Sequence, residues 1–391
     1  MPPSISSLLT RLHLHSSDLS QELVRPVLSV VEESQKQAED KADLPSIQQC
    51  AIHFEMLEAF YALRKRVTAS RKLAKALIRI HIKKSHGKAH KDRELSDTWY
   101  RFLSIAVVRF QKWIRATDHH LRAKQPEMND PIVLPPLDIL MVWHAFLLNP
   151  HDFSGYCISN HLNHIRDLSF PWTAVHQALS QENWNYTLPD RTATWLFDEL
   201  NIAPDLIMAL QRNEAMTAKD IATTVSAENT PLIDNILRQG IFIDKMHNLL
   251  WICSPALQGT LARALARYEH FVTLFRLHPD KILVPTLDVD LVWHTHLCSA
   301  ELYEKSMLER TGRYINHDDK LGEEVLTGAF ETTGELFEAA TGEIYGVCFC
   351  WDCEAMRSAG EMVGGEVGAD ARKKVEEEVD SYWRAEMARQ K

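Results

Sequence analysis

The sequence predicts a mainly α protein built from two related halves. Apolar residues recur every three or four positions along most of the chain, as in amphipathic helices. One motif also occurs twice, 150 positions apart. Residues 132–148 and 282–298 share eight of seventeen residues (Ile, Pro, Leu, Asp, Val, Trp, His and Leu). We therefore expect two pseudo-repeated units, each a helix, a proline loop and a second helix, packed as one helical unit.

The composition is that of an ordinary folded protein. The chain has 391 residues, of which 45% are hydrophobic and 25% charged, which suits two or three domains or one large core. No apolar run approaches the roughly 18–20 residues that span a bilayer, and the N-terminal region lacks the pattern of a secretory signal. We expect a cytoplasmic protein without a transmembrane segment; a nuclear location stays open.

The N-terminal half, 1–203, is expected to contain a strongly basic helix. Amphipathic runs cover 46–85 and 98–116. Residues 64–93 carry twelve Lys or Arg and one acid, although the net charge of the chain is −10. Arg71, Lys75 and Arg79 repeat every four positions and form a cationic stripe, which suits an anionic partner: nucleic acid, a membrane surface or an acidic protein. The alternative is a solvated helix face paired with acids elsewhere.

The C-terminal half, 204–357, repeats this plan. Its run 261–277 corresponds to 98–116, and short extended stretches are expected at 132–134 and 282–284, just before the two motif helices. Gly and Thr punctuate 311–347, so this segment is expected to be irregular with short helices, and so is the Cys-containing segment that follows it. Residues 358–391 are expected to form a charged, peripheral helix.

Both copies of the motif keep an Asp just ahead of the apolar run. Asp138 and Asp288 are interpreted as helix N-caps, because an Asp there accepts hydrogen bonds from the free N–H groups of the first turn. The Trp-His pair is also shared, so we interpret His144 as a structural residue that hydrogen-bonds a loop.

Only the second copy carries further polar residues. Asp290 stands where the first copy has Leu140, and His296 where it has Phe146. Asp290 and His294 lie one helical turn apart, whereas His296 points about 160° away from His294. If His296 is functional, its side chain should meet His317, Asp318 or the cysteine segment, and Phe146 should lie in apolar surroundings. Exchanging His296 for Phe should then abolish metal or ligand binding and leave stability nearly intact.

Candidate metal ligands gather in and after the second motif. Zinc takes about four Cys and His ligands, and seven cysteines without a secretion signal argue against a disulfide framework. Zinc is therefore the expected cofactor. The alternatives are that Cys348 and Cys353 are small buried hydrophobic residues, or that the thiols have a redox or regulatory role. The candidate ligands are Cys348, Cys350, Cys353, His294, His296 and His317.

The candidate catalytic residues are Asp290, His296, Asp318 and Asp319. The last two lie near further acids and would suit Mg²⁺ with a phosphorylated substrate. No phosphate-binding Gly loop and no nucleophile elbow occur in the sequence. Whether the chain is an enzyme therefore stays open.

Several motifs, in order, resemble those of the glycine-rich-domain-containing-protein-like family. They are PTLDVDLVWHTH, RYINHDDK, FETTGELFEAATGEIYG and CFCWDCEAMR. The likeness covers roughly residues 45–357, and the last motif is most similar to the fungal branch, which carries a domain of unknown function. The resemblance implies an intracellular helical protein and no particular activity. The glycine-rich tail of plant members has no counterpart here.

Two functional hypotheses follow. The first is a non-catalytic, metal-stabilised intracellular protein that acts through partners. The second is a metal-dependent enzyme of small-molecule metabolism built on Asp290, His294, His296 and His317. A zinc site closed by four protein ligands favours the first hypothesis, and a site with an open coordination position favours the second.

Overall fold

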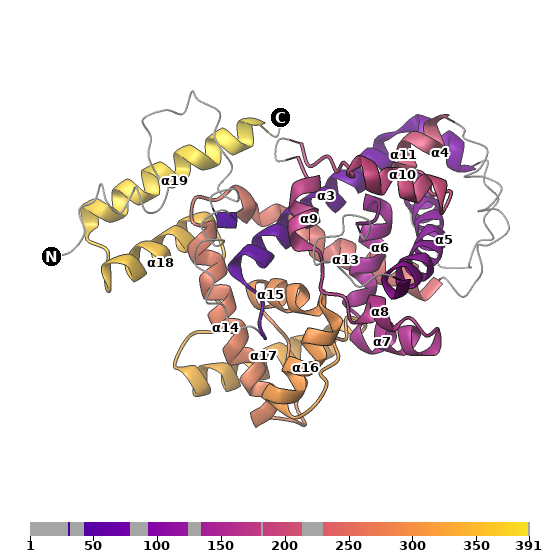
Figure 1. The fold of residues 1–391 in the computed structure, drawn as a ribbon. Coiled ribbons are helices and arrows are strands. Elements are labelled where there is room, and N and C mark those ends of the chain that lie inside the picture. Colours follow the sequence, from indigo (N-terminus) through magenta and orange to yellow (C-terminus); the bar gives the residue numbers. More distant parts are fainter. Residues whose placement is uncertain are drawn as a thin grey trace.

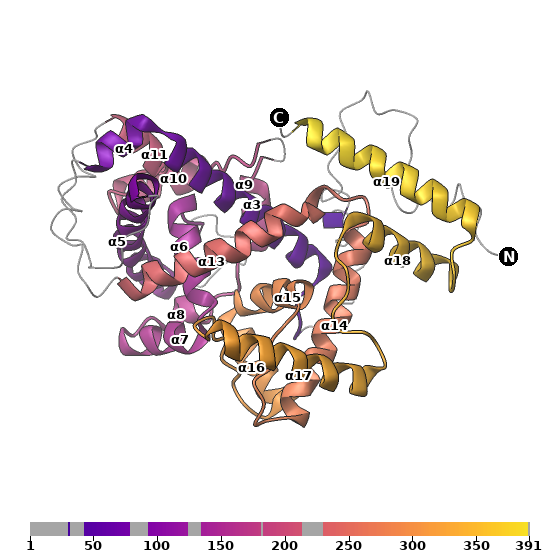
Figure 2. The same cartoon turned by 180° about the vertical axis from the view of Figure 1, so that it is seen from behind.

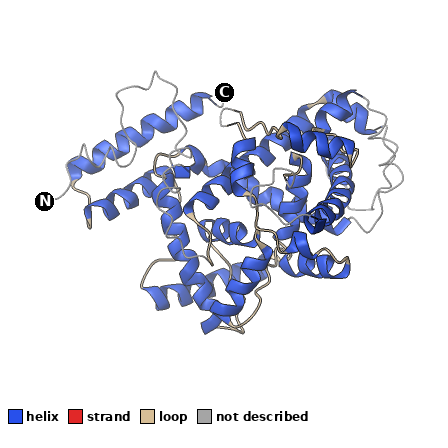
Figure 3. Ribbon diagram, viewed as in Figure 1, coloured by secondary structure: helices blue, strands red, loops and turns tan. Residues whose placement is uncertain are grey.

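The computed structural model of the chain is helical wherever it has regular secondary structure (Figure 3). It describes residues 30–31, 43–78, 93–123, 134–180, 183–212 and 230–389. Within these ranges no β-strand forms, and one isolated bridge joins Leu179 and Tyr186. The prediction of a mainly α fold is confirmed. Residues 134 and 282–284, which were expected to be extended strands, lie in loops, and 132–133 fall outside the described ranges.

In the described part of the N-terminal half, serines set the ends of the long helix α3 (Ile47–Ala69). Ser46 and Gln49 form a reciprocal capping box at the start of the helix, and the hydroxyl of Ser70 accepts from the Leu73 N–H at the start of the next helix. The helices of this half are α3 (Ile47–Ala69), α4 (Arg71–Ile78), α5 (Arg93–Ala123), α6 (Leu137–Leu147), α7 (Pro150–Ser159), α8 (Asn163–Arg166), α9 (Trp172–Ala178), α10 (Asp190–Asp198) and α11 (Leu206–Arg212).

The C-terminal half is more helical than its many glycines suggested. Residues 311–347 were expected to be irregular with short helices, but they include a helix of 19 residues. Gly312, Gly342 and Gly364 have φ of 77°, 73° and 70° and end three helices, which is the usual position of a left-handed glycine. The elements are α13 (Thr230–Leu249), the 3₁₀ turn η4 (Trp251–Cys253), α14 (Leu257–Leu277), α15 (Leu287–Leu297), α16 (Ala300–Thr311), α17 (Glu323–Thr341), α18 (Trp351–Val363) and α19 (Ala369–Arg389).

The two motif helices, α6 and α15, have the same length and the same ionic anchor. Asp138 accepts from Arg109 of α5 at 2.7 Å, and Asp288 accepts from Arg267 of α14 at 2.7 Å. Both ion pairs are buried. The capping prediction for the two Asp residues is wrong: each lies inside the first turn, neither caps its helix, and each meets the Arg of the preceding helix.

Aromatic contacts also correspond between the halves. Trp143 packs against Trp113 of α5 with ring centroids 5.2 Å apart, and Trp293 packs against Phe271 of α14 at 5.6 Å. The pairs lie at matching places after Arg109 and Arg267 in the sequence. These contacts are compatible with two pseudo-equivalent halves.

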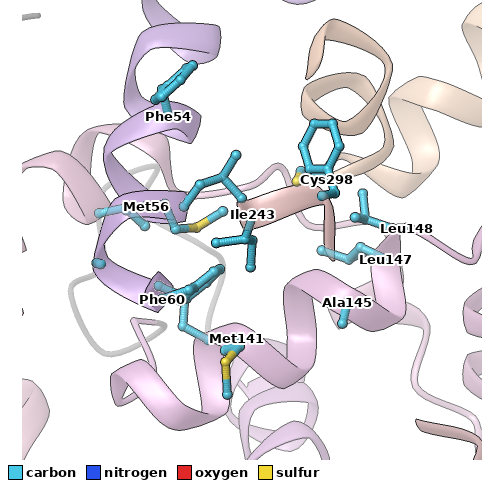
Figure 4. Packing of buried hydrophobic residues seen from close by; sticks show 14 of the residues in the cluster. Phe54, Met56, Phe60, Met141, Ala145, Leu147, Leu148, Ile243 and Cys298 are labelled. Atoms are coloured by element: carbon cyan, nitrogen blue, oxygen red, sulfur yellow. The ribbon is translucent and has the colours of Figure 1, made fainter. Parts of the chain in front are cut away.

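The halves share one core rather than two. Helix α13 follows residue 204 in the chain but packs against α3, α5 and α6 of the other half, and Figures 1 and 2 show it passing between the halves. Figure 4 shows Phe60 of α3 and Met141 of α6 beside Ile243 of α13, with Cys298 close by. Helices α18 and α19 pack together at one end of the molecule. No described helix is both long and apolar enough to cross a membrane.

Candidate metal centre

Three of the predicted site residues meet in the structure. Asp290 and His294 lie one turn apart on α15, and His317 comes from the loop between α16 and α17. The Nε2 atoms of His294 and His317 are 3.1 Å apart. The Oδ1 atom of Asp290 lies 3.3 Å from the first and 3.5 Å from the second. One carboxylate oxygen and two imidazole nitrogens thus form a small triangle.

The size of this triangle fits one metal ion. Ligand atoms about 2.1 Å from a metal lie roughly 3.0 Å apart in octahedral geometry and roughly 3.4 Å apart in tetrahedral geometry. The observed edges of 3.1, 3.3 and 3.5 Å lie close to this range. The buried Oδ1 of Asp290 has no hydrogen-bond partner among the described residues, although such an atom normally has one. The residues present therefore fit a metal ion.

Packing orients the two imidazole rings. His294 lies edge-on to Phe242 at 4.4 Å, and His317 lies edge-on to Trp293 at 4.9 Å, measured between ring centroids. The outer Nδ1 atoms of both histidines are buried and make no hydrogen bond in the described part of the chain. Aromatic neighbours, rather than a second set of hydrogen bonds, hold the two Nε2 atoms toward each other.

Burial keeps His294 neutral. It lowers the pKa of His294 well below the usual value of 6.5, and the nearby imidazoles of His317, His53 and His144 lower it further, because a second positive charge there would be repelled. A neutral imidazole offers the lone pair that a metal ion needs. At neutral pH this ligand atom is therefore available.

The site borders a cavity of about 430 Å³. His317 and Trp293 form part of its wall, so at least one proposed ligand residue adjoins the open space. The rest of the wall is mostly apolar with a few polar side chains, among them Phe275, Ile282, Arg313, Tyr314 and Asp318.

A second buried histidine pair lies in the core. Nε2 of His53 is 2.9 Å from Nε2 of His144, and Nδ1 of His53 is 2.8 Å from Oγ1 of Thr295. The Thr295 hydroxyl donates to the carbonyl of Leu291, so His53 must donate from Nδ1 and accept from His144. This arrangement needs no ion, although the thiol of Cys298 is close enough to be a third ligand. The loop partner expected for His144 is not formed, because its partner lies on helix α3.

His296 is separate from both histidine groups. Its Nδ1 lies 2.9 Å from the hydroxyl of Tyr268, and its ring meets Tyr303 edge-on. Burial lowers the pKa of His296 to about 3. Phe146, the corresponding residue, packs against Phe110 in aromatic surroundings, as predicted. His296 does have a polar partner, but this partner is a tyrosine and not the predicted His317, Asp318 or cysteine segment.

The two candidate aspartates after His317 have different roles. Asp319 accepts from Arg238 at 3.0 Å and from Gln239 at 3.3 Å, so it joins the loop to α13. Asp318 is exposed and accepts from the Lys320 N–H. Neither belongs to a group of three converging carboxylate, imidazole or thiol side chains in the described ranges. The expected Mg²⁺ arrangement is therefore not formed there.

The three clustered thiols form a group of their own at the start of α18. The sulfur atoms of Cys348, Cys350 and Cys353 lie within 4.8 Å of one another, and none of the described histidines joins them. The expected site that combines thiols with imidazoles is thus two separate groups. The buried-hydrophobe alternative is wrong for Cys348, which is exposed, while Cys353 is half-buried.

The cationic stripe is formed only in part within the described residues. Arg71 and Lys75 are exposed on α4, whereas Leu73 and Leu77 on its other face are buried. Arg79, the third predicted cation, lies outside the described ranges.

Part of the chain matches a known protein family. Residues 173–306 match the glycine-rich domain-containing protein-like family. The match includes Asp290 and His294 and ends before His317. No solved structure matches the chain.

Two plant proteins that are called glycine-rich domain-containing proteins are also similar to this chain. Glycine-rich domain-containing protein 1 of Arabidopsis thaliana is 25% identical over 228 residues, which are 55% of this chain and 26% of the plant protein. Glycine-rich domain-containing protein 2 of the same plant is 25% identical over 236 residues, 57% of this chain and 27% of its own length. The chain thus spans about a quarter of the length of these relatives.

Several site-forming residues were not singled out from the sequence. Arg109 and Arg267 are each followed directly by an aromatic residue, and a second aromatic residue stands four positions after each arginine. A comparison of the helices that precede the two motifs would therefore have found both arginines. The same comparison pairs Phe110 with Tyr268. His53 carries no such signal, because its partners are 91 and 242 residues away.

Proposed function

We propose that the protein is a metal-dependent enzyme acting on a small molecule, with Asp290, His294 and His317 holding one divalent transition-metal ion. The observation that carries this proposal is the convergence of their three ligand atoms at 3.1–3.5 Å. Two imidazoles and one carboxylate are a common ligand set for iron, zinc and related divalent ions. Three protein ligands also leave a coordination position open.

The adjoining cavity supports catalysis over a purely structural role. Its volume of about 430 Å³ lies in the range of small-molecule sites, which combine apolar walls with a few polar groups. A bound ion would supply a Lewis acid or an activated water. The chain itself would hold the ion, exclude bulk water with Trp293 and Phe275, and orient a ligand through the half-buried Arg313.

The second candidate is a metal-stabilised protein that acts through partners. It uses the same three residues, and it differs in expecting that the fold depends on the ion.

Placement of the chain in the fungal branch of the family rests on the segment CFCWDCE, and a cytoplasmic location rests on composition. Both belong to the proposal.

The decisive experiment counts metal ions and measures stability together. The full chain carrying Cys348→Ser, Cys350→Ser and Cys353→Ser, so that thiols cannot contribute, is dialysed against Zn²⁺, Fe²⁺, Mn²⁺ or Co²⁺ and analysed for bound metal. Adding Asp290→Ala or His317→Ala should abolish binding of about one equivalent. Adding Asp318→Asn, which changes a neighbouring residue outside the triangle, should leave this metal binding unchanged.

The thermal midpoint then separates the two candidates. Under the enzyme proposal the apo protein stays folded and the ion raises Tm in the parent chain but not in the Asp290→Ala chain. Unfolding on metal removal would favour the structural role. Absence of bound metal in the parent chain with all four ions would overturn both.

A further inference from the structure

The cysteine group at the start of α18 is built differently from the other cysteines. Cys348 and Cys350 are exposed and Cys353 is half-buried, although cysteine is among the residue types most often buried. The sulfur atoms of Cys348 and Cys350 are 3.4 Å apart, and all three thiols lie within 4.8 Å of one another. The remaining four cysteines, Cys50, Cys157, Cys253 and Cys298, are buried.

Two aromatic residues between the cysteines anchor the segment. The carbonyl of Phe349 accepts from Nε1 of Trp251 at 2.9 Å, and the ring of Phe349 meets the same Trp edge-on. The indole of Trp351 is buried and donates to the carbonyl of Leu249 at 2.9 Å. Because the aromatic residues of CFCW are fixed against the η4 turn and the end of α13, the alternate residues, Cys348 and Cys350, face outward. The fold therefore exposes these two thiols to solvent.

Positive charge and partial positive charge lie beside the cysteine group. Cys350 is the N-cap residue of α18 and Cys353 lies in its first turn, where free N–H groups and the helix dipole stabilise negative charge. The guanidinium of Arg357 donates to the carbonyl of Cys348.

We propose that Cys348, Cys350 and Cys353 bind one thiophilic d¹⁰ cation, Zn²⁺ or Cu⁺, as an exchangeable three-thiolate site distinct from the Asp290 centre. Thiolates about 2.3 Å from one ion lie roughly 3.8–4.0 Å apart, so small side-chain rotations bring the three sulfur atoms to this spacing. The net charge of a Zn²⁺–trithiolate is −1, which Arg357 and the helix N-terminus oppose.

The absence of a fourth ligand makes the site exchangeable. Among the described residues no imidazole or carboxylate joins the three thiols, whereas structural zinc sites are closed by four protein ligands. The open position lets a thiol of an incoming carrier bind the ion before a cysteine leaves it. Cys350 also borders a groove of about 1020 Å³ between α18 and α19, so the ion is reachable. The site is suited to passing on or sensing the ion, not to holding the fold.

The test uses the reduced full chain without oxygen, with Asp290→Ala and His317→Ala to empty the other centre. Zn²⁺ and Cu⁺ are each titrated in competition with a chromophoric chelator. We expect about one equivalent of ion, rapid transfer to excess chelator, and at least a roughly tenfold loss of affinity in Cys350→Ser and in Cys353→Ser. Asp352→Asn, between the thiols, should bind as the parent does. Comparing the two ions shows which one the site prefers.

Thermal unfolding without metal shows whether a substitution weakens folding rather than metal binding. The Cys→Ser chains should keep the Tm of the parent, because these side chains do not contribute to the core. The proposal is overturned if Cys350→Ser binds as tightly as the parent, if the reduced parent binds neither ion, or if removing the ion unfolds the chain. The last outcome would indicate a closed structural site.

Discussion

At the level of single residues, a hydrogen bond in one half replaces an aromatic contact in the other. His296 and Tyr268 pair at 2.9 Å in the second half, where Phe146 and Phe110 pack at 6.1 Å in the first. Both residues of the pair differ between the halves, so the His296–Tyr268 pair takes the place of the aromatic pair in the repeated architecture. His296 stays apart from the proposed metal centre, although it is only two residues from His294, because the two side chains point about 160° apart on the helix.

The pair predicts a stability effect for His296→Phe. The Phe would leave the Tyr268 hydroxyl buried without a partner, which costs about 1–3 kcal/mol. The double change His296→Phe with Tyr268→Phe should recover most of this loss, because it recreates the contact of the other half. Urea unfolding of the four chains measures the coupling, and metal binding at Asp290 should be unchanged. Equal losses in the single and double variants would contradict this, and loss of metal binding would restore a functional role for His296.

The two motif aspartates make a second prediction. Removing one partner of a buried ion pair costs about 3–5 kcal/mol, whereas loss of a helix cap costs about 1 kcal/mol. Asp138→Ala and Asp288→Ala should therefore each lower the free energy of unfolding by the larger amount, because Arg109 or Arg267 remains buried and uncompensated. Denaturant titration decides between the two values, with the exposed Asp190→Ala as a control expected to have little effect.

At the level of elements, the two faces of the short helix α4 have different surroundings. Leu73 and Leu77 are buried, and α4 packs against α11. Arg71 and Lys75 on the opposite face are exposed. The helix therefore has one buried apolar face and one exposed cationic face.

This division predicts separable effects of substitutions in α4. Arg71→Gln with Lys75→Gln should leave Tm nearly unchanged, since surface substitutions usually change stability by less than about 0.5 kcal/mol. The same chain should elute from an immobilised polyanion at lower salt than the parent, because fewer counterions are released. Leu77→Ala should instead cost about 2–5 kcal/mol. Identical elution of the parent and the double variant would favour the solvated-face interpretation.

At the level of the whole molecule, buried histidines bind the two halves together and make the fold sensitive to acid. His53 of α3 contacts His144 of α6 in its own half and Thr295 of α15 in the other half, and His294 lies within electrostatic reach of both histidines. Burial lowers the pKa of His53 and His294 well below 6.5, and that of His144 and His296 to about 3. All four are therefore neutral in the folded protein near pH 7.

The sign of the pH dependence follows from these shifts. Each folded pKa lies below the unfolded value near 6.5, so the unfolded chain takes up protons first as the pH falls. The contribution to stability is present in full above about pH 6.5 and declines toward about pH 3, by up to about 1.4 kcal/mol per pH unit for each histidine.

Unfolding free energies at several pH values from 7.5 to 4.5 test this dependence. We expect a steep loss of stability in this window for the parent chain and a shallower one for His144→Gln, whatever the absolute stability of that variant. The exposed His119→Gln is the control and should keep the slope of the parent. A flat profile for the parent between pH 6.5 and 4.5 would show that the buried histidines are not responsible.

Local sequence alone determined the parts of this protein that depend on neighbours in the chain. Apolar spacing predicted most of the helices, although not the 19-residue helix α17, and the repeated motif predicted two corresponding helices. The spacing of Asp290 and His294 placed both on one face of a helix, and the spacing of the cysteines kept their thiols close together. Each of these features is fixed by helix geometry or by a few bonds of backbone.

Only the tertiary structure decided which distant groups meet. His317 completes the triangle of proposed ligands from a loop, 23 residues after His294, and His53 reaches Thr295 across 242 residues. Packing likewise gave Asp138 an arginine in place of the predicted free N–H groups, and gave His296 a tyrosine. The orientation of a side chain along one helix follows from its position in the sequence. Its partner depends on which other helix is pressed against that face, and the burial of apolar surface across the whole chain sets this choice.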